Sequence, residues 1–139
     1  MSRVIKGGWH DGASAKTVTF DNGTLRATAD STPASVLIYG FSGTSLNIGA
    51  GGMVLDSNGF HTISSSVMSG VGGLTKEGNG TFTMNAANTY GGATLVSQGR
   101  LQAGIDNAFS ATSVHTVAAG AALATGGFNQ TVASLANAG

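Results

Sequence analysis

The chain has 139 residues, a formal net charge of zero and a charged fraction of only 9%, against ~25% in an average soluble domain. This length allows one domain at most, and the six Lys and Arg residues are too scattered to form the basic patch that nucleic acids require. No apolar run approaches the ~20 residues of a membrane helix, and the N-terminus lacks the apolar stretch of a secretion signal. We therefore expect no nucleic-acid partner and no membrane insertion by this segment.

Glycine, Ser, Thr and Asn supply most of the polarity, a composition typical of turns and strands rather than helices. Strand-like pieces with alternating apolar residues recur, separated by Gly, Asn or Ser. In chain order they are residues 18–20, 24–26, 35–39, 45–48, 53–55, 61–63, 81–84, 94–96, 101–103 and 114–117. Such short strands fit an all-β sandwich or a solenoid, and internal repetition decides between the two.

A repeating unit, apolar-x-x-Gly-x-apolar, occurs at residues 20–25, 48–53 and 96–101, and a fourth copy at 117–123 starts 21 residues after the third. That offset is about one turn of a parallel β-helix with three strands per turn. The repetition therefore predicts an all-β fold, a parallel β-helix (β-solenoid) of about six short turns with glycines at its corners. We place the solenoid at residues 17–139 and expect residues 1–16 to be a loosely ordered segment or a cap.

The most distinctive segment spans residues 72–104. Its signature consists of Gly73, Leu74, Thr75, Lys76, Gly78, Gly80, Phe82, Asn88, Thr89, Tyr90, Gly92, Thr94, Val96, Gly99 and Leu101. It resembles the autotransporter-associated β-strand repeat, or passenger-associated transport repeat, in which Gly-Leu-Thr-Lys-x-Gly-x-Gly-Thr-Leu-x-Leu precedes Asn-Thr-Tyr-x-Gly-x-Thr. Phe82 and Met84 stand where that family usually has Leu, and Glu77 where it often has Thr. The resemblance extends from about Lys16 to the C-terminus.

The resemblance implies a right-handed parallel β-helix from the passenger of a bacterial autotransporter, secreted or displayed at the cell surface by type V secretion through the outer membrane. It implies a structural stalk that supports translocation and extracellular folding, cut from a larger polypeptide. Two alternatives stay open, an adhesin or glycan-binding surface and a self-assembling extracellular fibre. The implied partners are neighbouring turns of the parent passenger, and uncapped ends would also allow an end-to-end homo-oligomer.

Candidate chemical residues are few. Trp9-His10-Asp11 suggests a His–Asp site, but adjacent residues of an extended segment point to opposite sides. Asp56, His61 and His115 lack the regular spacing of metal ligands; we expect Asp56 to accept backbone hydrogen bonds before a turn and both histidines to face solvent. No Gly-x-Ser-x-Gly nucleophile elbow is present. The sequence thus predicts no enzyme activity, no metal and no cofactor.

Two further expectations concern packing within the signature. Phe82, Leu95 and Leu101 are expected to point into the core, although the neighbours of Leu95 compete for the same face. The resemblance suggests that Tyr90 lies along the solenoid wall, with Asn88 bonding across the turn.

Overall fold

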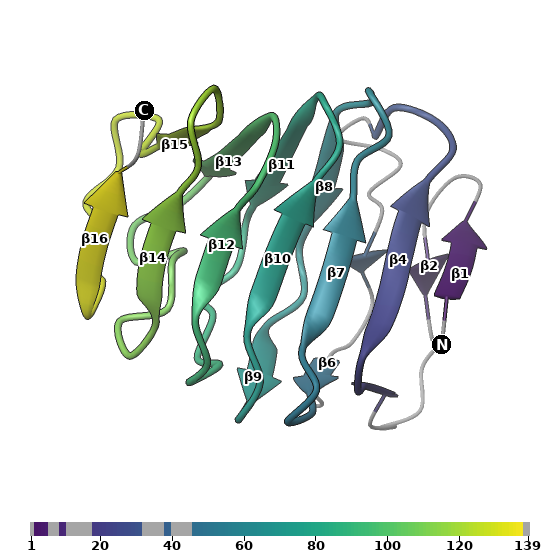
Figure 1. Cartoon of the computed structure of the whole chain (residues 1–139), viewed down its shortest axis with the longest axis horizontal. Coiled ribbons are helices and arrows are strands. Elements are labelled where there is room, and N and C mark those ends of the chain that lie inside the picture. The colour runs from purple at the N-terminus through teal and green to yellow at the C-terminus, as the bar shows by residue number, and fades with distance from the viewer. Residues whose placement is uncertain (1, 6–8, 11–17, 32–37, 40–45, 138–139) are drawn as a thin grey trace.

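All regular structure in the described part of the chain is β-strand. The computed structural model describes residues 2–5, 9–10, 18–31, 38–39 and 46–137. Its strands stand side by side in a stack that runs from the N-terminal to the C-terminal end of the chain (Figure 1). No helix in these ranges is long and apolar enough to cross a membrane.

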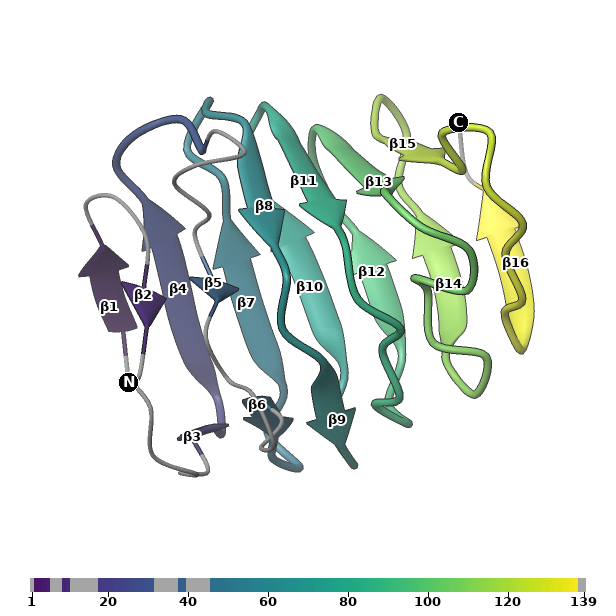
Figure 2. The ribbon, with the colours of Figure 1, turned by 180° about the vertical axis from the view of Figure 1, so that it is seen from behind.

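Within the described residues the strands form three sheets. The first sheet contains seven strands: β1 (Ser2–Ile5), β4 (Gly23–Ala27), β7 (Met53–Asp56), β10 (Leu74–Glu77), β12 (Thr94–Val96), β14 (Val114–Val117) and β16 (Ser134–Asn137). The second sheet contains six: β2 (Trp9–His10), β5 (Ile38–Tyr39), β8 (Thr62–Ser64), β11 (Thr81–Met84), β13 (Arg100–Ala103) and β15 (Ala122–Ala124). The third contains β3 (Val18–Phe20), β6 (Leu46–Ile48) and β9 (Met68–Gly70). Figure 2 shows the molecule turned by 180°, so that the strands of the second sheet face the viewer.

Every strand pairs in parallel with a strand of an adjacent turn, and the strands inside each sheet pair on both sides, as β10 does with β7 and β12. A strand inside a sheet thereby satisfies its backbone groups through its neighbours in the stack. The predicted all-β parallel solenoid is confirmed.

The turns are less regular than expected. Three of them place a strand in each sheet, namely β3–β4–β5, β6–β7–β8 and β9–β10–β11. The next two, β12–β13 and β14–β15, have no strand in the third sheet within the described residues, because residues 85–93 and 104–113 take irregular paths. Complete three-stranded turns are therefore fewer than the six expected.

The N-terminal residues extend two of the sheets. Ser2–Ile5 pairs with β4, and Trp9–His10 pairs with β5. Residues 11–17 lie outside the described part of the chain, so the division at residue 16 stays an expectation.

The core is a narrow set of columns built by the parallel register. One column of the first sheet runs through Leu25, Leu55, Lys76, Val96 and Val117, all buried. A second column runs through Met53, Leu74, Thr94, His115 and Leu135. Phe82 and Leu101 are neighbours in the second sheet and fully buried, as predicted.

Leu95 is placed differently from the prediction. Its side chain is 38% exposed, whereas Thr94 and Val96 on either side of it are fully buried. Side chains alternate along a strand, so only one of the two faces of β12 can point inward. The threonine is accepted in the core because its hydroxyl finds partners there.

The repeating unit apolar-x-x-Gly-x-apolar forms two different corners of the solenoid. Its first two copies join the third sheet to the first, and its last two join the first sheet to the second. In each case the unit begins in one strand and ends in the next, with both apolar ends inside or against the core. Glycine is required at such corners: Gly80 has a φ of 106°, and a Cβ there would collide with the carbonyl oxygen of Phe60.

Candidate functional site

Some of the polar side chains of residues 74–103 lie inside the solenoid. Lys76 and Thr94 are fully buried and Asn88 is 5% exposed. Buried polar groups are costly unless they are hydrogen-bonded. Their partners therefore show what this segment is built to do.

Lys76 occupies an aliphatic column and ends in a cage of oxygen atoms. Its Nζ donates to the carbonyl oxygens of Gly78 at 2.7 Å, Glu77 at 2.8 Å and Gln98 at 3.2 Å, and to Ser57 Oγ at 2.8 Å. Ser57 belongs to the preceding turn and Gln98 to the following one. Since an ammonium has three protons, the cage satisfies it completely and joins three successive turns.

The environment of this ammonium shifts its proton affinity. Burial lowers the pKa of Lys76 from 10.5 to about 8, while the charges of Asp56 and Glu77 act in the opposite direction. Lys76 therefore still carries its proton at neutral pH. The charge held inside the column is tolerated because carbonyl dipoles surround it.

Asn88 forms a second link between turns. Its Oδ1 accepts from the backbone N–H of Met68 at 2.8 Å, and its Nδ2 donates to the carbonyl oxygens of Ala108 at 2.8 Å and Ala86 at 3.1 Å. The partners at positions 68 and 108 lie one turn before and one turn after it. The expected bonding of Asn88 across the turn is confirmed, and it replaces ladder bonds where the third sheet stops.

Tyr90 and Thr94 form a third link. Tyr90 is fully buried, so it lies inside the solenoid rather than along its wall. Its hydroxyl lies 2.7 Å from Thr94 Oγ1, which lies 2.8 Å from Ser113 Oγ in the following turn. Burial raises the pKa of the Tyr90 phenol to about 12, so the hydroxyl stays protonated and able to donate.

Serine residues of the following turn complete this cluster. Ser110 Oγ donates to the carbonyl oxygen of Tyr90 at 2.6 Å, and Ser113 Oγ to that of Gly92 at 2.7 Å. Both serines are fully buried. The irregular stretches at 85–93 and 104–113 are thus joined by side chains, where a regular third strand would use only its backbone.

His115 is buried, contrary to the expectation that it faces solvent. It falls in the inward column of β14, its Nδ1 lies 3.0 Å from the carbonyl oxygen of Ser113, and its ring packs 5.5 Å from Phe109 between centroids. Its Nε2 has no hydrogen-bond partner among the described residues. Burial lowers the pKa of His115, so it is neutral, with Nδ1 as the donor.

The other candidate residues stay apart. Asp56 accepts from the backbone N–H of Asn58 at 2.8 Å, as expected before a turn, and also pairs with Arg26 at 2.9 Å. His61 is exposed, as expected. The structure describes only the backbone of Trp9 and His10, and Asp11 lies outside the described residues. Within the described part of the chain, no three His, Asp or Glu residues gather closely enough to hold a metal ion.

The remaining signature residues frame these links. Leu74, Phe82, Val96 and Leu101 are buried in the core, while Thr75 is partly exposed and Thr89 exposed. Glycines mark the corners: Gly78, Gly80 and Gly99 have positive φ, and a side chain at Gly73 or Gly92 would collide with backbone of an adjacent turn. Apolar, polar and glycine positions of the signature thus have separate structural roles.

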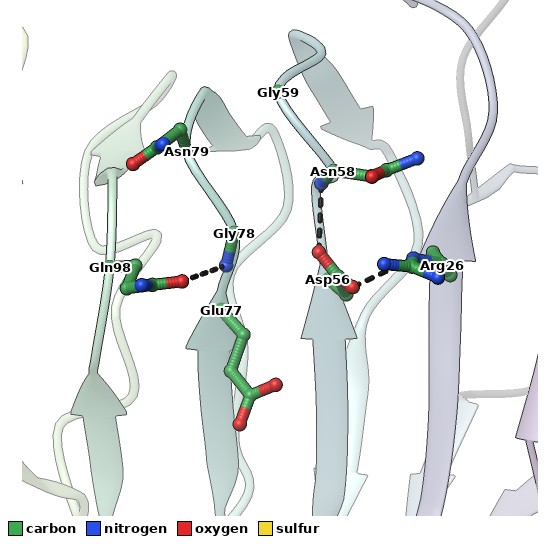
Figure 3. Close-up of a pocket in the computed structure, with 8 residues that line it drawn as sticks. All are labelled: Arg26, Asp56, Asn58, Gly59, Glu77, Gly78, Asn79 and Gln98. Carbon is green, nitrogen blue, oxygen red and sulfur yellow. Dashed lines mark hydrogen bonds and ion pairs between the residues drawn. The ribbon is translucent and has the colours of Figure 1, made fainter.

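A polar groove crosses the outside of the corner that contains Lys76 (Figure 3). It has a volume of about 380 Å³ and is lined by Arg26, Asp56, Asn58, Gly59, Glu77, Gly78, Asn79 and Gln98. Gln98 Oε1 accepts from the backbone N–H of Gly78 at 3.2 Å, and this bond and the Arg26–Asp56 pair form its two sides. The groove presents both hydrogen-bond donors and acceptors to solvent.

The comparison with protein families identifies the segment that carries the buried links. Residues 74–103 match the model of the passenger-associated-transport-repeat. The chain contains this repeat. Together with the parallel β-solenoid, the match fits a β-helical segment of an autotransporter passenger. Neither the curated proteins nor the solved structures include a match to the chain.

Sequence reasoning identified the repeat but not the burial of its polar residues. It also missed three serines outside the repeat that form hydrogen bonds with residues of the repeat, namely Ser57, Ser110 and Ser113. The available signal was spacing: Ser57 precedes Lys76 by 19 residues and Ser113 follows Thr94 by 19. Polar residues that lie about one turn before or after a polar position of the repeat are therefore the candidates for its hydrogen-bond partners.

Proposed function

We propose that the chain is a structural stalk segment of a secreted or surface-displayed autotransporter passenger, which supports outer-membrane translocation and extracellular folding. One observation carries the proposal: inside the matched repeat, Lys76, Asn88 and Thr94 are buried and each bonds to an adjacent turn. These polar residues are engaged in joining turns. The proposed role is structural and not enzymatic.

In the repeat, the docking of each turn on the folded part of the solenoid is favourable in free energy. An unstacked turn leaves its strands, its apolar columns and its polar side chains in water. Docking against a folded turn forms a parallel strand pair, buries the column residues and closes bonds such as Asn88–Ala108, each worth about 0.5–1.5 kcal/mol net. Successive gains of this kind would draw an exported chain outward without nucleotide hydrolysis.

The test is surface display. We would place residues 1–139 between a secretion signal and the translocating barrel of a bacterial autotransporter, and measure display by cleavage with added protease. The parent segment should reach the surface in a protease-resistant form. Asn88→Ala should lower display relative to Asn85→Ala, which changes an exposed asparagine of the same stretch. Equal display of a variant shown to be unfolded would refute the proposal.

Glycan binding is the second candidate, and the polar groove favours it. Arg26, Asp56, Asn79 and Gln98 present donors and acceptors of the kind that bind sugar hydroxyls. Glycan-array binding that is lost in Asn79→Ala but kept in Asn85→Ala would support this function. Absence of binding to any glycan on the array would count against it.

We also propose that a neighbouring β-helix turn covers the C-terminal end of the stack. A groove of about 320 Å³ lies there, lined by residues that include Val117, Leu123 and Leu135. Leu135 is 57% exposed although its position continues an inward column. In the isolated chain the same surface supports end-to-end association. Sedimentation should then show oligomers at high concentration that Leu135→Asp abolishes; a monomer at all concentrations would contradict the association.

A further inference from the structure

Lys76 interrupts a column that is otherwise aliphatic. The parallel register places it between Leu55 of the preceding turn and Val96 of the following turn, and the column continues to Leu25 and Val117. Four of these five positions carry an ordinary core residue. The buried ammonium therefore needs an explanation that packing alone does not supply.

An aliphatic column is poor at fixing which turn stacks on which. Leu25 and Leu55 occupy the same column, so strand β10 could pair with β4 instead of β7 and still pack its apolar face. A slide by two residues along β7 likewise keeps the inward side chains inward. Apolar contacts are not directional, so the packing of the column by itself distinguishes poorly between these pairings.

The ammonium distinguishes these registers through one of its four acceptors, the Ser57 hydroxyl, which the preceding turn supplies. Ser57 Oγ, which accepts from Lys76 at 2.8 Å and donates to the carbonyl oxygen of Asn79 at 2.8 Å, lies directly after β7. Continuing the register of β4 and β7 by one residue places Ala27 at the equivalent position one turn earlier. Alanine has no hydroxyl, so a strand stacked there would bury Lys76 without this acceptor, a costly arrangement for a charge.

We propose that Lys76 fixes the register of the solenoid, excluding skipped and slid pairings of β10 rather than contributing net stability. Single polar residues in apolar seams have this role in coiled coils. Here the seam is a column of a parallel β-solenoid, and the matching group is the Ser57 hydroxyl together with the carbonyl oxygens of the corner. The inference concerns the isolated chain and does not depend on secretion.

The first test replaces Lys76 with an unbranched apolar residue of similar volume. Lys76→Met should keep a urea midpoint no lower than that of the parent, but its amide NMR spectrum after refolding should show additional sets of peaks. Leu55→Met, in the same column, is the matched control and should give one set. A single set for Lys76→Met would overturn the proposal. So would failure of Lys76→Met to fold, because the ammonium would then be needed for the fold itself.

The second test detects the skipped pairing directly. Thr24, Val54 and Thr75 are successive partners on the outer face of the first sheet, so Thr24 and Thr75 lie two strands apart. That separation is about 9.6 Å, beyond the ~7 Å limit for a disulfide. Since the chain has no cysteine, the pair Thr24→Cys/Thr75→Cys should stay reduced in the parent and form a disulfide only if β7 is skipped.

The outcomes are distinct. After refolding under mild oxidation, we expect the 24/75 disulfide in the Lys76→Met background and its absence with Lys76 or with Leu55→Met. The adjacent pair Val54→Cys/Thr75→Cys should form with Lys76 and with Leu55→Met, which shows that the cysteines are reactive, and should form to a lower yield in the Lys76→Met background. Equal 24/75 yields with and without Lys76 would refute a role in excluding the skipped register.

Discussion

Replacing Asn88 by alanine tests the links between turns most directly. The change removes the acceptor of the Met68 N–H and the two donors that reach the carbonyl oxygens of Ala86 and Ala108. Ala108 keeps a weaker bond at 3.3 Å from the backbone N–H of Asn88. The Met68 N–H has no such substitute within the described bonds, and the site is too enclosed for bulk water to provide one.

The magnitude follows from these contacts. An unsatisfied buried donor costs about 1–3 kcal/mol, and the lost bonds to carbonyl oxygens add about 1 kcal/mol. We expect Asn88→Ala to lower the free energy of unfolding by about 2–4 kcal/mol. For a urea slope of about 2 kcal/mol per molar, the midpoint would fall by about 1–2 M.

The assay is urea denaturation with two comparison variants. Asn85→Ala, at an exposed position, should stay within about 0.5 kcal/mol of the parent. Asn88→Asp keeps the acceptor for Met68 but turns an oxygen toward the carbonyl oxygens of Ala86 and Ala108. The folded state should therefore raise the pKa of that carboxyl, so this variant should lose stability as pH rises from 4 to 7. Equal midpoints for Asn88→Ala and Asn85→Ala would refute the reasoning.

Three further predictions concern stability. Leu101→Ala should cost about 2–5 kcal/mol in urea titration because its side chain is fully buried, whereas Leu95→Ala, at an exposed position, should cost under about 1 kcal/mol. Lys76 has a folded pKa of about 8 against 10.5 unfolded, so the unfolded state binds more protons between these values, and stability should rise by about 2 kcal/mol from pH 7 to 9.5 relative to Lys76→Met. The lowered pKa of His115 means that stability should fall as pH drops from 7 to 5, and His115→Gln should flatten that dependence in the same titration.

The solenoid could be predicted from the sequence because glycine and apolar residues recur with a fixed polarity. Within the unit at 96–101, Leu101 was correctly predicted to point inward, whereas Val96, which is also buried, had been assigned to the face opposite Leu95. Leu95 was predicted wrongly because its hydrophobic side chain was expected to be buried. Side chains alternate along β12, and it is Thr94 and Val96 that face the core. Thr94 is accepted inward through its bonds to Tyr90 and Ser113, and those partners are visible only once the turns are stacked.

His115 was misplaced for a related reason. A histidine in a short strand is usually read as a surface residue, but position 115 is the register partner of Thr94, and the column decides its direction. Phe109, from an irregular stretch, supplies the ring that packs against it. No local sequence pattern predicts that contact, because it depends on the path of residues 104–113 between the second and the first sheet.

The burial of Lys76 connects these observations. A narrow column of aliphatic side chains stabilises stacking in general, but it accepts many pairings with nearly equal energy, whereas hydrogen bonds require particular atoms at particular distances. Lys76, Asn88 and Thr94 place such requirements on both the preceding and the following turn. A repeat of 30 residues therefore fixes how the turns before and after it stack. Those neighbouring turns can themselves be built from similar apolar units. Exchanging all three residues for apolar ones should accordingly leave a β-rich circular dichroism spectrum. Amide hydrogen exchange should then show several populations with different protection patterns, where the parent shows one.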